Sequence, residues 1–400
     1  MNSKLIGGIL LVVGCTIGAG ILALPVATAE LGFIGSMVLL MSAWLIMTIC
    51  AFLFLEVTLW LPPGTNLISM AGATLGEPGQ AITWFTYLIL LYSFICAYIA
   101  GGGDLVHYLL GTAGIQLSLG ASSVLFTGAF GLIVYLGIRS VDYVNRGLMS
   151  GKMGVFVLLL LLMVPFVSAE NLGAGEFKRI ASPSGMMIVA AAFGSLMIIP
   201  SLRTYFGDDI KSLRKAIFIG LLIPLLCYVA WDMVILGIIP LSGSPGLRQM
   251  IHSSSTNSDM LKALHALLQN DAVTTLAKFF TSICMTTSFL SISLCLTDFL
   301  SDGLRMSKQG WNNFVIYGAT FIPPVVVVLF YPEGFIRALE YAGVCCVLLM
   351  VLLPPLMVWR GRYHQAQAQS GHGVIGGKFL LAVLMIFATL MIGFGLEGAL

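Results

Sequence analysis

The sequence predicts an all-α polytopic membrane protein, and three observations carry this prediction. Of the 400 residues, 58% are hydrophobic and only 9% are charged, a composition that excludes a soluble globular domain. Apolar runs of about 20 residues recur along the chain, each long enough to cross about 30 Å of hydrocarbon as a helix. Runs such as VFVLLLLLMVPFV (155–167) do not alternate in polarity as barrel strands do, which favours helices over a β-barrel.

Eleven spans are expected, in a single transmembrane domain that covers residues 1–400. The first five form one repeat (about 5–168), the next five form a second repeat (about 185–359), and an extra helix (377–397) follows. Between spans 7 and 8, the segment SDMLKALHALL (258–268) is expected to form a short helix across the outer face. The expected spans are 5–28, 33–60, 82–110, 122–139, 153–168, 185–207, 214–239, 272–300, 313–331, 335–359 and 377–397.

The basic residues predict an orientation in the membrane. Of the two sides that alternate spans define, one has 13 Lys and Arg residues, Lys152 among them, and the other has 6. The positive-inside rule therefore predicts a cytoplasmic N-terminus and a C-terminus on the opposite side, the periplasm of a bacterium. The N-terminal run lacks a small-residue cleavage site, so we interpret it as a retained first span.

Several classes of partner are not expected. The basic residues are dispersed at span ends, so the net charge of +2 indicates no nucleic-acid partner. The eight cysteines fall in apolar runs without a Cys-x-x-Cys pair, which predicts small buried hydrophobic side chains rather than a metal site or a disulfide framework. The expected partners are a small-molecule substrate and the lipid bilayer, with no cofactor.

The centre of span 1, GCTIGAGILALP (14–25), carries residues that a helix interior disfavours. Glycine costs about 1 kcal/mol there and proline about 3 kcal/mol. One interpretation is close packing, because Gly14 and Gly18 match the small-xxx-small motif. The other is a discontinuous helix, whose unwound backbone exposes carbonyls to a cation and N–H groups to an anion.

Span 6 carries a second interruption. The stretch AAAFGSLMIIPS (190–201) places Gly194 and Pro200 near its middle. Spans 1 and 6 occupy equivalent places in two five-span halves of opposite topology, and paired interruptions of this kind indicate a substrate site between inverted repeats. Helix N-termini hold a carboxylate without a buried Arg or Lys, while carbonyls of the unwound turns meet an amino group. The pattern therefore predicts an amino acid as the substrate.

Five stretches, in order, resemble the hydroxy and aromatic amino acid permeases of the amino acid–polyamine–organocation superfamily, most closely its bacterial tyrosine-specific branch. The resemblance covers nearly the whole chain. Its strongest stretches are GCTIGAGILALP (14–25), FLFLEV (52–57), AYIAGGGDLV (97–106), SLRKAIFIGLLIPLLCYVAWD (212–232) and TSFLSISLCLTDFLSD (287–302).

The resemblance implies a fold, a function and a site. It implies the inverted-repeat fold of the bacterial leucine transporter, ten core helices plus an eleventh. It also implies uptake of an aromatic amino acid, tyrosine first, across the inner membrane with an ion, usually a proton. The residues it assigns to the charged ends of the substrate are Gly14, Thr16, Ile17, Gly18, Ala19 and Gly20 in span 1, and Phe193, Gly194 and Ser195 in span 6.

The chain departs from that family in span 6. The aromatic permeases usually read Phe-Gly-Phe-His there, whereas this chain reads Phe-Gly-Ser-Leu at 193–196. A histidine beside the substrate is missing, so the resemblance leaves the side-chain specificity and the coupling proton open.

Hydroxyl groups in span 8 are candidates for ion coupling. In related folds, hydroxyls at the positions of Thr287, Ser288 and Ser291 surround a sodium ion together with carbonyls of span 1, because oxygen ligands suit a hard cation. The alternative is that each hydroxyl bonds the carbonyl four residues earlier in its own helix.

Acidic residues in spans 2 and 3 are further candidates, since a charge at the bilayer centre costs about 2.5–3.5 kcal/mol on insertion scales. Glu56 in span 2 and Asp104 in span 3 are each expected either to relay a proton or to have a structural role. The structural alternatives are a gate or interfacial position for Glu56 and a hydrogen-bonded pair with His107 for Asp104. Asp232 and Glu340, nearer the outer ends of their spans, are expected to snorkel or to form an external gate.

Two aromatic residues of span 3, Tyr92 and Tyr98, are candidates to stack against an aromatic substrate or to hydrogen-bond it. Most other aromatic residues are expected to be core or lipid-facing.

The leading hypothesis is a secondary transporter. A sodium-coupled or broader-specificity neutral amino acid symporter is the alternative within that class, and an ion channel is the alternative from another class. An enzyme is not expected, because the chain carries no His-Glu-x-x-His or Gly-x-Ser-x-Gly motif. A Walker motif is also missing from the sequence, so ATP is not expected to drive transport directly.

Overall fold

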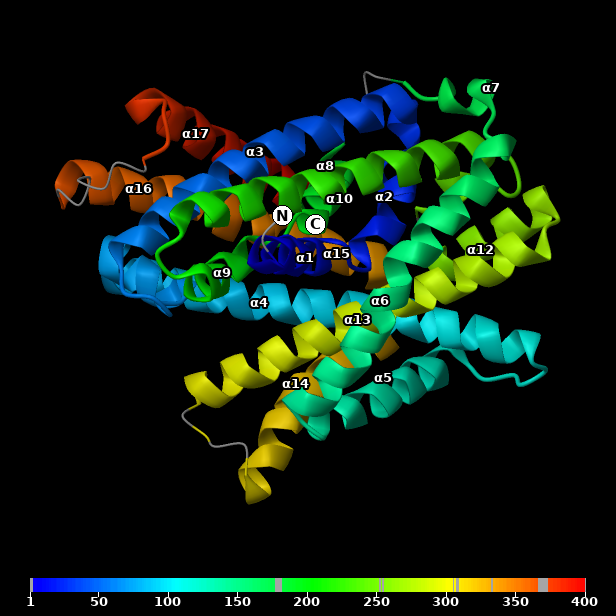
Figure 1. Cartoon of the computed structure of the whole chain (residues 1–400). Helices are drawn as coiled ribbons and strands as arrows, with labels where there is room; N and C mark the ends of the chain where they lie inside the picture. The colour runs from blue at the N-terminus through cyan, green and yellow to red at the C-terminus, as the bar shows by residue number, and fades with distance from the viewer. Residues whose placement is uncertain are drawn as a thin grey trace.

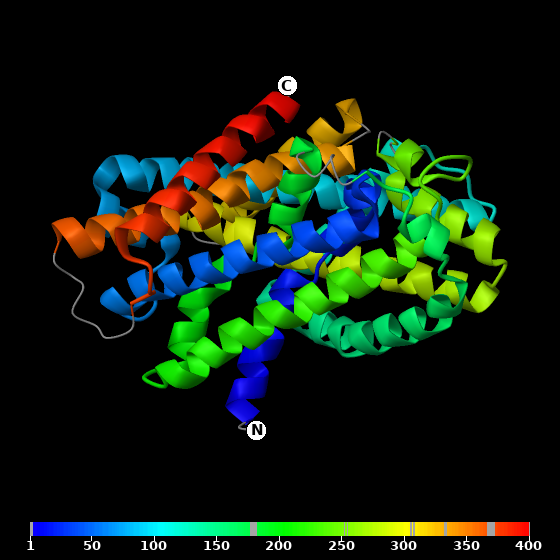
Figure 2. The same cartoon turned by 90° about the horizontal axis from the view of Figure 1, so that it is seen from above.

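The computed structural model describes residues 3–176, 182–251, 253, 255–304, 306, 309–331, 334–365 and 373–399. Within these residues every regular element is a helix (Figure 1), which confirms the all-α class. The two views show α12 at one end of the bundle and α16 at the opposite end (Figures 1 and 2).

The first half of the chain begins with a broken helix. α1 (Ser3–Thr16) and α2 (Gly20–Thr28) are separated by residues 17–19, and η1 (Ala29–Leu31) leads into α3 (Gly32–Trp60). α4 (Leu67–Thr112) is bent at Gly76, whose φ of 81° is a left-handed value that glycine adopts without strain. α5 (Leu119–Tyr135), α6 (Ile138–Met163) and η2 (Val164–Phe166) complete this half.

The second half repeats the pattern after the short α7 (Ala169–Leu172). α8 (Pro183–Ala192) ends at a break over residues 193–195, and η4 (Leu196–Ile198) and α9 (Ile199–Phe206) follow. The remaining elements are α10 (Ile210–Ile238), α11 (Leu247–Met250), α12 (Thr256–Leu268), α13 (Asp271–Gly303), α14 (Gly310–Phe330), α15 (Gly334–Cys346), the π-helical η5 (Val347–Leu352), α16 (Leu353–His364) and α17 (Gly377–Ala399).

The described residues contain nine helical stretches long and apolar enough to cross a membrane, and two shorter apolar helices, Lys4–Thr16 and Leu119–Tyr135. Their order follows the expected spans, and α12 occupies the segment expected to form a short helix. The number of eleven crossings stays a prediction. α6 begins at Ile138, so the helix extends well before the expected span 5, whereas its apolar membrane-crossing stretch, Gly147–Phe166, lies close to the expected 153–168.

The helices pack in two groups that meet around the breaks. α1 packs against α10, α10 against α3, and α2 against α8; separately, α4, α5, α13 and α14 pack against one another. α17 lies outside both groups, against α8, α15 and η5. The expectation that all cysteines are buried is wrong for Cys15 and Cys295, which are exposed.

Candidate functional site

The two interruptions are real breaks, and they lie beside each other. Residues 17–19 and 193–195 lie outside the regular helices, which confirms the discontinuous first and sixth spans. A Cβ added to Gly20 would lie 3.2 Å from the Cα of Ala192, so the start of α2 contacts the end of α8 directly. The first break is shorter than expected, because Gly14 and Thr16 are still helical in α1 and Gly20 already belongs to α2.

Side chains from two other helices hold the first break. The Ala19 amide donates a hydrogen bond of 2.8 Å to Ser288 Oγ on α13, and the Lys152 ammonium on α6 donates to the Ile17 carbonyl. Gly18 has no room for a side chain, since an added Cβ would lie 2.6 Å from Ser288 Oγ. Backbone groups that unwinding releases are therefore satisfied by fixed partners, as a buried break requires.

Tyr228 on α10 connects the two breaks. Its buried hydroxyl lies 2.7 Å from the Thr16 carbonyl and 2.9 Å from the Ala192 carbonyl, the last residues of α1 and α8. Its ring packs edge-on against Phe193 at a centroid distance of 5.2 Å. The hydroxyl has one proton and donates to one carbonyl at a time. Both helix ends are thus fixed to the same atom of α10.

The second break has a polar group without a partner. Ser195 is buried, and its hydroxyl makes no hydrogen bond within the described part of the chain. The cavity that Ser195 lines measures only about 10 Å³, at the lower limit for one water molecule. The bundle is therefore closed around this hydroxyl.

Aromatic side chains line the second break. A Cβ added to Gly194 would lie 3.7 Å from the ring of Phe94 and 3.1 Å from Cys346 Sγ. Phe94 stacks on Tyr98 at 5.8 Å, and the Tyr98 hydroxyl faces Ser288. The structure thus brings Tyr98 to both breaks, together with Phe94, which sequence reasoning did not single out.

Other candidates lie away from the breaks or already have partners. The Tyr92 hydroxyl donates to the Ala319 carbonyl of α14 at 2.7 Å, on the far side of α4. Thr287 Oγ1 bonds the Ile283 carbonyl of its own helix at 2.8 Å, which is the structural alternative stated for it. Ser291, one turn beyond Ser288, is partly exposed.

The two acidic candidates have structural partners. Glu56 forms a two-bond ion pair with Arg362 of α16, at 2.6 and 2.5 Å. Asp104 accepts bonds from the Ser258 hydroxyl at 2.5 Å and the Ser258 amide at 2.9 Å. The expected pair of Asp104 with His107 is wrong, since His107 bonds the Leu117 carbonyl instead. Both acids belong to contacts between helices rather than to the breaks.

Sequence reasoning missed Lys152. Lys152 is expected among the basic residues at a span end, whereas its side chain lies inside the bundle and is 1% exposed. The length of α6 explains the difference. This amphipathic helix begins 14 residues before Lys152, so the lysine lies within a helix rather than in a loop. The asymmetry of the remaining Lys and Arg residues still points the same way.

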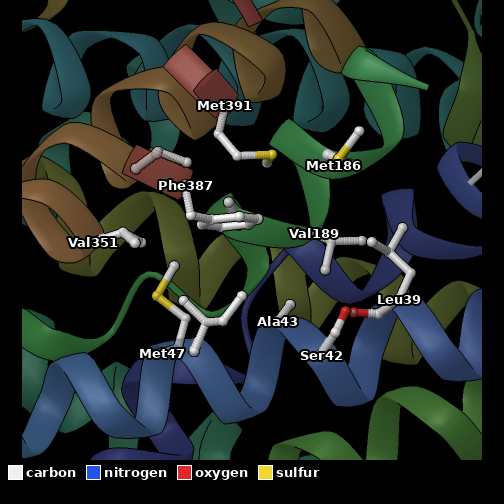
Figure 3. Close-up of a pocket in the computed structure, with 12 residues that line it drawn as sticks. Leu39, Ser42, Ala43, Met47, Met186, Val189, Val351, Phe387 and Met391 are labelled. Carbon is white, nitrogen blue, oxygen red and sulfur yellow. Dashed lines mark hydrogen bonds between the residues drawn. The ribbon is translucent and has the colours of Figure 1, made fainter. Parts of the chain in front are cut away.

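A larger cavity of about 290 Å³ lies on another face of α8 (Figure 3). α3, η5 and α17 complete its wall, and its lining is apolar except for Ser42, whose hydroxyl bonds the Leu39 carbonyl. It has no group to bind the charged ends of an amino acid. The breaks, although closed, therefore remain the better candidate site.

Comparisons with known proteins agree with this architecture. A model of the tryptophan/tyrosine permease family matches residues 1–394. Tyrosine-specific transport systems 1 and 2 of Haemophilus influenzae are 34% and 32% identical to the chain, over 97% and 98% of it and 96% of each relative. The solved structure of MhsT in complex with L-phenylalanine, which has the leucine-transporter fold, superposes with a TM-score of 0.65 at 13% identity, covering 99% of this chain and 98% of that one.

These findings confirm the expected fold and the expectation that the chain is a multi-pass membrane transporter rather than an enzyme. The chain belongs to the tryptophan/tyrosine permease family.

Proposed function

We propose that this protein takes up an aromatic amino acid, tyrosine first, by symport with protons across the bacterial inner membrane, with its N-terminus in the cytoplasm. The observation that carries the proposal is the pair of adjacent breaks at residues 17–19 and 193–195, joined through Tyr228. Relatives named for tyrosine transport support the choice of substrate.

The breaks offer complementary partners for a zwitterion. α2 begins at Gly20 without a side-chain cap, so its first N–H groups and the positive end of its dipole suit a carboxylate. The last carbonyls of α1 and α8, at Thr16 and Ala192, converge on one point and suit an ammonium group. The free Ser195 hydroxyl adds a donor and acceptor beside them.

The side chain of the substrate has an aromatic lining to enter. Phe94 and Tyr98 stack on one side of the second break, and Phe193 lies on the other with Tyr228. Aromatic pairs at such distances contribute about 0.5–1.5 kcal/mol beyond their buried area. This lining favours an aromatic amino acid over a small neutral one.

Proton coupling fits the first break better than sodium coupling. A sodium ion needs several free oxygen ligands. Here the Ile17 carbonyl accepts from the Lys152 ammonium, Ser288 accepts from Ala19, and Thr287 bonds its own helix. The Lys152 ammonium thus occupies the position that a metal cation would need.

Uptake into proteoliposomes tests the proposal. Purified protein should accumulate labelled tyrosine when the outside is acidic, and an inward sodium gradient at equal pH should add nothing. Competition by all twenty amino acids should rank the aromatic ones first. Uptake that follows sodium, or that never saturates as in a channel, would refute the proposed symport.

A further inference from the structure

Asp232 is a buried carboxyl group that is only half satisfied. It lies on α10 one helical turn beyond Tyr228, and its side chain is fully buried. Oδ2 accepts from the Thr28 hydroxyl at 2.9 Å and from the Ser36 hydroxyl, whereas Oδ1 has no partner within the described residues. The expectation that Asp232 snorkels is wrong.

No opposite charge compensates this carboxyl among the described side chains. Seven elements pack against α10, namely α1, α2, α3, α6, α7, α9 and η2. Among the described residues, only Thr28 and Ser36 form hydrogen bonds with the Asp232 side chain. None of the charged or titratable groups with described side chains on those elements forms a hydrogen bond or an ion pair with Asp232; these groups are Lys4, Cys15, Cys50, Glu56, Tyr143, Lys152, Glu170, Arg203 and Tyr205. An ionised carboxylate in such surroundings is strongly disfavoured.

The helix dipole disfavours the charge as well. Thr28 is the last residue of α2, so Asp232 lies at the negative end of that helix. Asp104 is the opposite case, because both of its oxygens are paired with Ser258 in the first turn of α12, at a positive end. Asp104 suits a carboxylate, and Asp232 suits a neutral carboxylic acid.

The hydrogen count supports the neutral form. The Thr28 hydroxyl also lies 2.9 Å from the Leu24 carbonyl and has only one proton to donate. If the carboxyl carries a proton on Oδ2, the carboxyl donates that proton to a neighbouring hydroxyl, and the Thr28 hydroxyl donates its own proton to the Leu24 carbonyl. A metal cation fits less well, since Oδ2 and two hydroxyls supply three oxygens and hard cations take six or more.

We propose that Asp232 carries the coupling proton. Its carboxylate takes a proton from water on the outer side, stays neutral while α2 is docked on α10, and returns the proton to water on the inner side. α2 runs from Gly20, directly after the first break, to Thr28, which bonds Asp232, so loss of the proton loosens the same short helix that holds the substrate. This inference rests on the proposed proton symport.

The test compares driven and undriven transport in Asp232→Asn. Asparagine keeps the size and the neutrality of the protonated group but cannot release a proton. We expect tyrosine exchange without a gradient to stay within about twofold of the unsubstituted protein. Accumulation under an inward pH gradient, and tyrosine-dependent acidification read by a trapped pH dye, should fall by about tenfold or more. Unchanged acidification per tyrosine in this variant would overturn the inference.

Two further variants keep the result decisive. Asp104→Asn, the matched buried acid, should leave the ratio of protons to tyrosine unchanged. If Asp232→Asn fails to exchange tyrosine, Ser36→Ala provides the test. Removing a donor to the carboxylate should raise the pH midpoint of uptake by about one unit. An unchanged midpoint would assign Asp232 a merely structural role. If the unsubstituted protein ignores the pH gradient, the proposed proton symport itself is wrong.

Discussion

The two breaks differ in how completely the protein satisfies them. At residues 17–19, Lys152 and Ser288 from two different helices hold the backbone, and Tyr228 bonds the Thr16 carbonyl just before the break. At residues 193–195, Tyr228 bonds only the Ala192 carbonyl, and the Ser195 hydroxyl is left without a partner within the described residues. We therefore propose that the first break is a rigid frame and that the substrate completes the second.

The largest effect is expected when a side chain is added inside the first break. Gly18→Leu places a side chain where an added Cβ already lies 2.6 Å from Ser288 Oγ, so we expect tyrosine uptake to be abolished while membrane insertion persists. Gly128→Leu is the control, because Gly128 is exposed on α5 with open space around it. Normal uptake by Gly18→Leu would mean that the site lies elsewhere.

Removing the buried ammonium should have the next largest effect. Lys152→Met keeps the apolar stem but leaves the Ile17 carbonyl without its donor. A buried bond to a charged group contributes about 1.5–3 kcal/mol, so tyrosine affinity should fall by about 10- to 100-fold in a binding assay. Lys262→Met, on the surface, serves as control. Wild-type affinity in Lys152→Met would show that the first break needs no fixed cation.

Tyr228→Phe loosens both breaks at once by removing the hydroxyl between Thr16 and Ala192. The loss of a neutral hydrogen bond costs about 0.5–1.5 kcal/mol, so we expect a lower unfolding temperature in detergent and uptake reduced by roughly threefold to tenfold. Tyr92→Phe removes a hydroxyl that bonds a single carbonyl, and that carbonyl lies away from the breaks, so uptake should stay unchanged. Equal losses in the two variants would argue against a special role for Tyr228.

The smallest effect is expected from Ser195→Ala, and it tests most directly whether the two breaks differ. Ser195→Ala removes a hydroxyl that has no protein partner, so thermal stability should not fall. If the substrate completes this break, KM for tyrosine should rise by about twofold to tenfold with little change in the maximal rate. Ser282→Ala, whose hydroxyl bonds its own helix, is the control. A drop in stability with unchanged KM would contradict the assignment.

The sequence was enough to locate the breaks. Gly18 and Gly194, each in an apolar run with a proline beyond it, mark positions where helix propensity is lost, and propensity is a local property. It also marked Tyr98 and Ser288 as candidates, and the structure brings both to the breaks. It could not separate Tyr98 from Tyr92, because the face of α4 that meets the breaks depends on its packing against α13, α14 and α15.

Composition and local pattern alone determined that this chain is a bundle of membrane helices with two paired interruptions, since hydrocarbon requires every backbone group to be satisfied within a helix unless the protein supplies other partners. Only the tertiary structure decided which side chains those partners are. Lys152, Tyr228 and Asp232 lie more than 100 residues from the groups of the first broken span that they contact, and helix packing alone sets such contacts.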